Sequence, residues 1–238
     1  MISWIFSTLC AFFVKGLCGF ANTLVFTTLL SFSNNNLNIS PIELLLGYPT
    51  NAIIAWKNRK LINLHICIPL TLLVIAGSIP GILFLKNADA GILKIFFGIT
   101  IILLAFEMLL RNKHAKLHKQ STLILSIIGV LSGLLCGLYG VGALLGAYLS
   151  RVTSNNHSFK GNLCFVFFFE NTFRIIVYSL SGLITLSTLM QAIPLFPFML
   201  LGLFSGMTTG KKVSDNTAKK IVLIALIISG ISLIANNL

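Results

Sequence analysis

Two apolar stretches, residues 1–32 and 121–150, are each too long for one simple membrane crossing, and glycines interrupt both near the middle. A turn inside lipid is tolerated only where protein or a water-filled cavity satisfies the freed backbone groups. Interrupted segments at corresponding places in two halves of a chain are the best sequence indication of a binding site between the halves. The two breaks therefore constrain both the fold and the position of any site.

The composition predicts an integral, all-α polytopic membrane protein. Of 238 residues, 56% are hydrophobic and 9% are charged, and apolar runs of about 20 residues recur along the chain. With the two broken segments counted as hairpins, we expect about 8 to 10 membrane-embedded helices. The predicted segments are 1–33 (interrupted), 41–55, 61–85, 90–110, 121–150 (interrupted), 160–181, 187–210 and 217–236.

The charge of +12 predicts topology and not a nucleic-acid partner. If every segment crossed once, the basic loops would divide between both faces, against the positive-inside rule. If each broken segment returns to the face it left, four basic loops share one face, which we assign to the cytoplasm, and both termini lie opposite. The residues of these loops are Lys57, Arg59, Lys60, Arg111, Lys113, Lys116, Lys119, Arg151, Lys160, Lys211, Lys212, Lys219 and Lys220.

If each broken segment returns to the face it left, each half crosses the membrane an odd number of times. This predicts two inverted-topology repeats, each opening with a glycine-broken helical hairpin. Residues 1–110 form the first repeat, residues 111–120 a basic cytoplasmic linker, and residues 121–238 the second repeat. A weak internal similarity supports a duplication. Gly16 and Gly19 match Gly137 and Gly140, while Gly77 and Gly81 match Gly202 and Gly206.

Lys15 and Asn22 are the candidate anion contacts of the first break. Lys15 is the only basic residue in its segment and directly precedes Gly16, and a charge deep in a membrane protein is costly and usually functional. The alternative is that Lys15 snorkels to the interface. Helix N-termini at such breaks also favour anions, although glycines alone could serve only close helix packing.

Glu170 and Arg174 are the candidate charged pair of the second half. They stand four residues apart, so they share a helix face, with Asn171 beside them. Arg174 could bind an oxyanion with Glu170 as its partner or as a proton acceptor; alternatively, the pair only fastens the bundle. Asn51 lies at the corresponding place in the first half.

Two further carboxylates, Glu43 and Glu107, lie near the ends of their segments, and we expect both at the membrane interface. No nucleophile with a positioned base appears, so no enzymatic activity is predicted, and neither a cofactor nor a metal is expected. The alternative function is a membrane thiol–disulfide electron carrier using Cys18 and Cys136, each of which precedes a break glycine by one residue. The Pro-Cys context expected for such carriers is missing.

The glycine motifs resemble those of the sulfite exporter TauE/SafE family. The resemblance rests on the Gly16–Gly19 break, on Gly133-Leu-Leu-Cys-Gly-Leu-Tyr-Gly-Val-Gly142-Ala-Leu-Leu, and on Asn171-Thr-Phe-Arg174 with the residues that follow it. It extends over essentially the whole chain. The chain departs from the family pattern where Ala21 and Asn22 replace a denser glycine run. The resemblance implies export of sulfite, sulfoacetate or related organosulfur anions.

Together these features predict a secondary permease of a bacterial-type inner membrane that moves a small anion by alternating access. Its expected partners are the anionic substrate, the lipid bilayer and a coupling ion, H⁺ or Na⁺, and assembly into a homo-oligomer is left open. The predicted substrate-binding residues are Lys15, Gly16, Gly19, Asn22, Asn51, Gly137, Gly140, Gly142, Glu170, Asn171 and Arg174.

Overall fold

The computed structural model describes residues 1–31, 36–87, 122–153 and 155–210, with isolated positions between 89 and 106 and between 227 and 234. The regular secondary structure of these residues is helical throughout, which confirms the all-α prediction. Nine positions of the predicted segment 90–110 are described, all of them helical, and three positions of the segment 217–236. The linker 111–120 and Glu107 lie entirely outside them.

The first half of the chain forms a helical hairpin followed by two long helices, and the second half repeats that order. The helices of the first half are α1 (Ile2–Cys18), α2 (Asn22–Ser31), α3 (Asn36–Lys57), the short η1 (Arg59–Leu61) and α4 (Leu64–Asn87). Those of the second half are α6 (Thr122–Tyr139), α7 (Ala143–Val152), α8 (Asn156–Leu180), α9 (Leu186–Ala192), η2 (Ile193–Leu195) and α10 (Phe196–Thr209).

Both predicted breaks are present, and each begins at a glycine with left-handed backbone. Gly19 follows α1 with φ 85°, and Gly140 follows α6 with φ 72°, a conformation that glycine adopts without a Cβ penalty. The amide of each donates to the carbonyl four residues earlier, Lys15 or Cys136, at 2.7 Å. The returning helices α2 and α7 have 10 residues each, or about 15 Å, roughly half the thickness of the hydrocarbon core.

Three of the described helical stretches are long and apolar enough to cross a membrane. They are Leu64–Leu85, His157–Leu180 and Leu186–Thr209, with mean hydropathies of 2.3, 1.5 and 1.7. The last of them joins α9, η2 and α10 into one span, as the predicted segment 187–210 requires. Outward-facing side chains such as Leu72, Leu83 and Leu180 are more than half exposed, which suits an environment of lipid.

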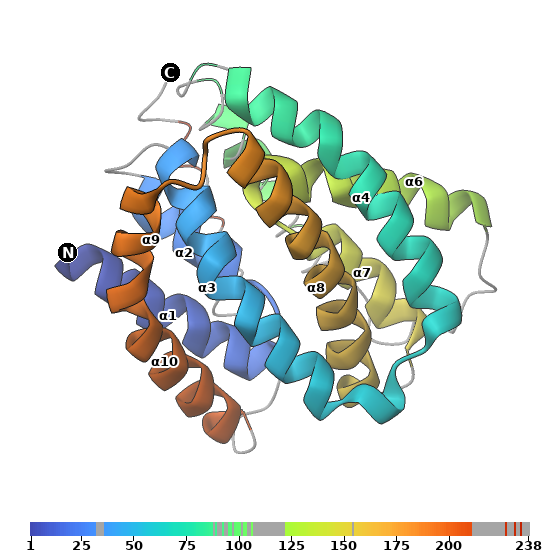
Figure 1. Ribbon diagram of the computed structural model, residues 1–238. Coiled ribbons are helices and arrows are strands. Elements are labelled where there is room, and N and C mark those ends of the chain that lie inside the picture. The colour runs from blue at the N-terminus through green and yellow to red at the C-terminus, as the bar shows by residue number, and fades with distance from the viewer. Residues whose placement is uncertain are drawn as a thin grey trace.

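The helices pack in three pairs. Figure 1 shows α3 and α8 beside each other in the middle of the bundle, α1 with α10 on one side, and α4 with α6 on the other. The central pair is antiparallel. Ser40 and Tyr178 bond at one end, Tyr48 and Thr172 further along, and Asn58 and His157 at the other end.

Each outer pair is parallel and crosses at glycines, so a hairpin from one half packs on the last described helix of the other. A Cβ placed on Gly206 of α10 would lie 3.0 Å from Cα of Gly16 in α1, and one on Gly81 of α4 would lie 3.1 Å from Cα of Gly137 in α6. Backbones approach this closely only where small residues face each other. Four of the glycines matched within the sequence therefore meet across the two crossings, Gly16 with Gly206 and Gly81 with Gly137.

Replacing Gly133 by alanine should destabilise the α4–α6 crossing. The new Cβ would meet the Val74 carbonyl and would lie 2.9 Å from Cα of Gly77, so backbone must move, at a cost of about 1 to 3 kcal/mol. We expect a lower melting temperature for the detergent-solubilised protein, measured by fluorescence-detected size exclusion. The matched control is Gly146→Ala, whose Cβ meets nothing closer than 3.9 Å, and an equal loss in both variants would contradict the prediction.

Candidate functional site

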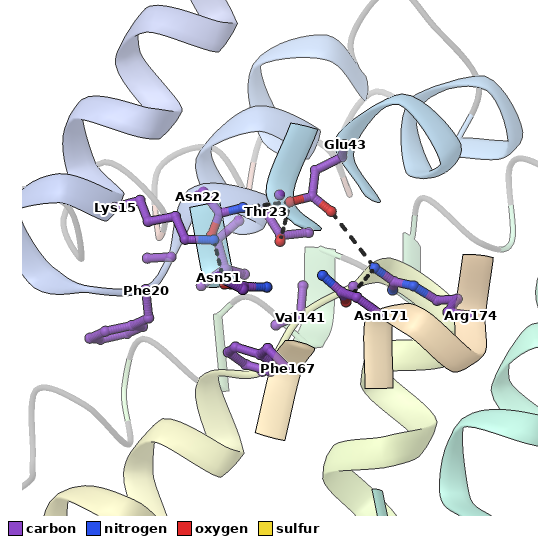
Figure 2. A pocket seen from close by; sticks show the side chains of 15 residues that line it. Lys15, Phe20, Asn22, Thr23, Glu43, Asn51, Val141, Phe167, Asn171 and Arg174 are labelled. Carbon is purple, nitrogen blue, oxygen red and sulfur yellow. Dashed lines mark hydrogen bonds and ion pairs between the residues drawn. The ribbon is translucent and has the colours of Figure 1, made fainter. Parts of the chain in front are cut away.

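The two breaks meet α3 and α8 around one small cavity of about 20 Å³, room for a single water molecule. Polar side chains of α1, α2, α3 and α8 line it, and Figure 2 shows them pointing toward one another. The lining residues are Lys15, Phe20, Ala21, Asn22, Thr23, Leu24, Glu43, Gly47, Asn51, Gly140, Val141, Gly142, Phe167, Asn171 and Arg174.

Lys15 enters the cavity from the last turn of α1 and is 2% exposed. Its Nζ donates a hydrogen bond of 2.7 Å to Oδ1 of Asn51 on α3. This burial excludes snorkelling to the interface in the conformation described. An ammonium group buried this deeply requires compensating polar partners. Asn51 is its hydrogen-bond partner among the described residues, which leaves two of its three hydrogens for a ligand.

Arg174 enters from the opposite side, on α8, and is 1% exposed. Its Nη1 donates to the carbonyl of Cys136 at the end of α6, and its Nη2 donates to Oδ1 of Asn171 at 3.5 Å. The predicted pairing with Glu170 is present, with Nε and Oε1 3.8 Å apart. Neither of those two atoms has a hydrogen-bond partner among the described residues.

Glu43 lies at the centre of the site, so its predicted interfacial position is wrong. The residue is 2% exposed, because α3 begins at Asn36 and not near residue 41, which places Glu43 two turns inside the helix. Its Oε1 accepts from Asn22 Nδ2 at 2.5 Å and from Thr23 Oγ1 at 2.8 Å. Its Oε2 lies 3.9 Å from Arg174 Nη2.

The buried charges of the site cancel. Lys15 and Arg174 bring two positive charges, and Glu43 and Glu170 bring two negative ones. Mutual neutralisation is the condition under which ionised groups can remain inside a protein of low dielectric. The four charged side chains of the site therefore neutralise one another, and a charged ligand that enters the site must alter its net charge.

Helix α8 also caps the carbonyl ends of both breaks. Lys160 Nζ donates to the Leu17 carbonyl at 2.9 Å, near the end of α1. Arg174 and Tyr178 donate to the carbonyls of Cys136 and Gly137, near the end of α6. The last carbonyls of a helix have no intrahelical partner, and cations at a C-terminus also complement the helix dipole.

The predicted site residues divide into those that line the cavity and those that support it. Lys15, Asn22, Asn51, Gly140, Gly142, Asn171 and Arg174 line it. Gly16 and Gly137 instead sit in the helix crossings, Gly19 packs on the Lys160 side chain, and Glu170 stands beside Arg174.

Sequence reasoning missed Thr23, Glu43 and Phe167. The Phe167 ring packs directly on Gly142, filling the space that a side chain there would occupy. Glu43 could have been found, since an acidic residue within an apolar run is a candidate functional residue by default. No comparable signal exists for a threonine or a phenylalanine.

Nothing in the described residues supports the thiol–disulfide alternative. The Cys136 thiol is free and donates to the Val141 carbonyl at 3.6 Å, while the Cys18 side chain lies outside the described part of the structure. The described residues also contain no group of three or more His, Cys, Asp or Glu that could hold a metal ion.

A comparison with family models matches residues 4–233 to the model described as Sulfite exporter TauE/SafE. The chain belongs to this family. No curated protein and no solved structure gave a match. Membership of the TauE/SafE family makes the protein a membrane transporter. The membrane-length apolar helices agree with this. The family implies export of sulfite or another anion.

Arg174→Ala should destabilise this TauE/SafE protein, because it would leave Glu43 and Glu170 buried without their shared partner. Removing one member of a buried ion cluster costs about 3 to 5 kcal/mol, so the melting temperature of the purified protein should fall by several degrees. Arg59→Ala is the control, since Arg59 is exposed and its guanidinium stacks on the Trp56 ring and donates to the Trp56 carbonyl at 3.1 Å, away from the cluster. Equal melting temperatures for the Arg174 variant and the wild type would contradict the cluster's role.

Proposed function

We propose that the protein is a secondary permease that exports a small anion, either sulfite, an organosulfonate or another small organic anion, by alternating access. The observation that carries the proposal is the convergence of Lys15 and Arg174, one cation from each half, on one small cavity. A guanidinium with planar donors suits an oxyanion, and a lysine opposite it would bind the same anion from the other half.

The breaks supply further affinity for a negative charge. The first turn of α2 and the residues immediately before α7 line the cavity, so the N-terminal ends of both short helices adjoin it, and such ends favour anions. A space of about 20 Å³ is too small for a sulfonate. The anion would therefore enter when α1–α2 or α6–α7 moves away from α3 and α8 and enlarges this space.

The proposal includes two inverted repeats, residues 1–110 and 121–238, joined by the basic linker 111–120. The packing supports it. The hairpin of each half meets the glycines of the other half's last described helix, and the central helices α3 and α8 are antiparallel. An exchange of equivalent partners is what a two-fold relation in the membrane plane would produce.

We assign the basic loops to the cytoplasm and both termini to the opposite face. The turn after α3 and the start of α8 lie together in support of this. Ser158 Oγ donates to the Leu61 carbonyl at 3.1 Å, and His157 Nδ1 lies 3.2 Å from Asn58 Oδ1. The basic residues Lys57–Lys60 and Lys160 therefore share one end of the bundle, in line with the positive-inside rule. The driving force would come from the gradient of a coupling ion, H⁺ or Na⁺, or from the anion's own gradient.

Flux through proteoliposomes tests the permease. We expect the wild type to exchange at least one of sulfite, sulfoacetate, methanesulfonate and acetate, because each offers oxyanion atoms to Arg174 and Lys15. Lys15→Ala and Arg174→Lys should each reduce that flux by about tenfold or more, since a lost contact to a charged ligand costs at least about 1.5 kcal/mol. Efflux of radiolabelled anion against unlabelled anion is the measurement.

Lys57→Ala is the matched control, since Lys57 is an exposed lysine at the end of α3. Absence of wild-type flux for all four anions would contradict the permease function. Equal losses of flux in Lys15→Ala and Lys57→Ala would also contradict it. A disulfide between Cys18 and Cys136, detected by alkylation in a protein without flux, would revive the electron-carrier alternative.

Labelling from one side of the membrane tests the orientation. Arg59→Cys and Asn155→Cys place reactive thiols on exposed positions of the two neighbouring turns, whereas Ser187→Cys places one at the far end of α8. An impermeant maleimide should label the first two variants only in inside-out vesicles and the third only in right-side-out vesicles. Opposite labelling of Arg59→Cys and Asn155→Cys would refute the shared face.

A further inference from the structure

Glu43 occupies the place where an anion would contact Arg174. Within the described residues, Nη1 of Arg174 is engaged by the Cys136 carbonyl and Nε faces Glu170. Nη2 donates to Oδ1 of Asn171 at 3.5 Å and stands 3.9 Å from Oε2 of Glu43, and both of these residues line the cavity with Arg174. An anion bound to Nη2 would therefore lie against an ionised carboxylate, and two negative charges at such a distance repel strongly where water is excluded.

A single proton removes this conflict. Oε1 of Glu43 already accepts from Asn22 and Thr23, and an uncharged carboxyl group can keep both bonds on its carbonyl oxygen. The proton would then sit on Oε2, which becomes a donor directed at the cavity beside Nη2. The same side chain thus repels an anion when ionised and helps to bind it when protonated.

We infer that Glu43 is the proton-binding residue of this transporter and that one proton on Glu43 accompanies each monoanion bound at Arg174 and Lys15. The inference rests on the proposed permease function and names its coupling ion. It makes transport of a monoanion electrically neutral, because the proton and the anion enter the site together. Proton and anion leave together when the site opens to the other side, so export in this mode is driven by the outward gradient of the anion and not by an inward proton gradient.

The charges around Glu43 agree with a one-to-one ratio. The titratable groups that face it are Lys15 on α1, Cys136 on α6, and Glu170, Arg174 and Tyr178 on α8. The ionised groups among them, with Glu43 itself, sum to zero. Adding a monoanion alone would leave a buried net charge of one, and a proton on Glu43 restores neutrality.

The surroundings of Glu43 favour a proton over Na⁺. The amide of Asn22 and the hydroxyl of Thr23 direct hydrogens at Oε1, and the guanidinium of Arg174 directs hydrogens toward Oε2. A metal cation at either oxygen would meet the positive ends of these donors. Glu170 is the weaker candidate, because it does not line the cavity and shares a helix with Arg174.

The test uses the full-length protein in proteoliposomes, with radiolabelled methanesulfonate as the probe and trapped pyranine reporting internal pH. Methanesulfonate keeps its charge across the pH range used, so pH effects report on the protein. For one-to-one coupling, a pH difference of about one unit should drive about tenfold accumulation of the probe. Adding external probe without a gradient should acidify the lumen, and replacing Na⁺ by choline should change neither result.

Two variants separate coupling from binding. In Glu43→Gln the side chain is permanently neutral, so probe–probe exchange should continue at a reduced rate while gradient-driven accumulation falls about tenfold, to equilibrium. Tyr178→Phe is the matched control within the cluster, because it removes a hydroxyl beside Arg174 without changing the charge of the site. It should leave the ratio of accumulation to exchange at the wild-type value, whatever its effect on the rates.

Each contrary outcome is distinct. Wild-type exchange without luminal acidification, a requirement for Na⁺, or a preserved ratio in Glu43→Gln would overturn the coupling role and leave the permease intact. If Glu43→Gln does not fold, the wild-type acidification and choline measurements still decide whether a proton or Na⁺ accompanies the anion. Absence of wild-type exchange of the probe, after the four-anion screen has also failed, would overturn both the permease and the coupling inferred from it.

Discussion

The arrangement of the site depends on the buried guanidinium of Arg174. It donates to the carbonyl of Cys136 near the end of α6, stands against Glu170 on its own helix and faces Glu43 across the cavity. Each contact joins it to a different part of the site: the backbone at the second break, a buried carboxylate, and a second carboxylate from the other half. The break, the central helix pair and the cavity are held in register because one side chain serves all three.

Close packing of glycines makes that register possible. The two crossings, Gly16 with Gly206 and Gly81 with Gly137, bring helix backbones nearly into contact. Lipid provides no hydrophobic drive for helices to associate, so van der Waals fit at such crossings stabilises the bundle. The glycines therefore have two roles. Some allow the turn beside the cavity, and others let the hairpins pack closely on the opposite half.

Much of the fold and part of the site could be predicted from the sequence. Glycines mark both breaks to within a few residues, and the rarity of charges in apolar segments pointed to Lys15 and Arg174. Glu43 was misplaced because segment ends read from hydropathy missed the polar first turn of α3, which begins at Asn36. The roles of Gly16 and Gly137 could not be assigned, because sequence spacing does not tell which face of a helix meets a neighbour and which faces a cavity.

Helix α8 has a property that follows from its two caps. Lys160 near its start bonds the end of α1, and Arg174 about three-quarters along it bonds the end of α6, so one helix is attached to both hairpins at different heights. A tilt of that helix which lengthens one attachment changes the other as well. A movement of one hairpin is therefore transmitted through α8 to the other hairpin.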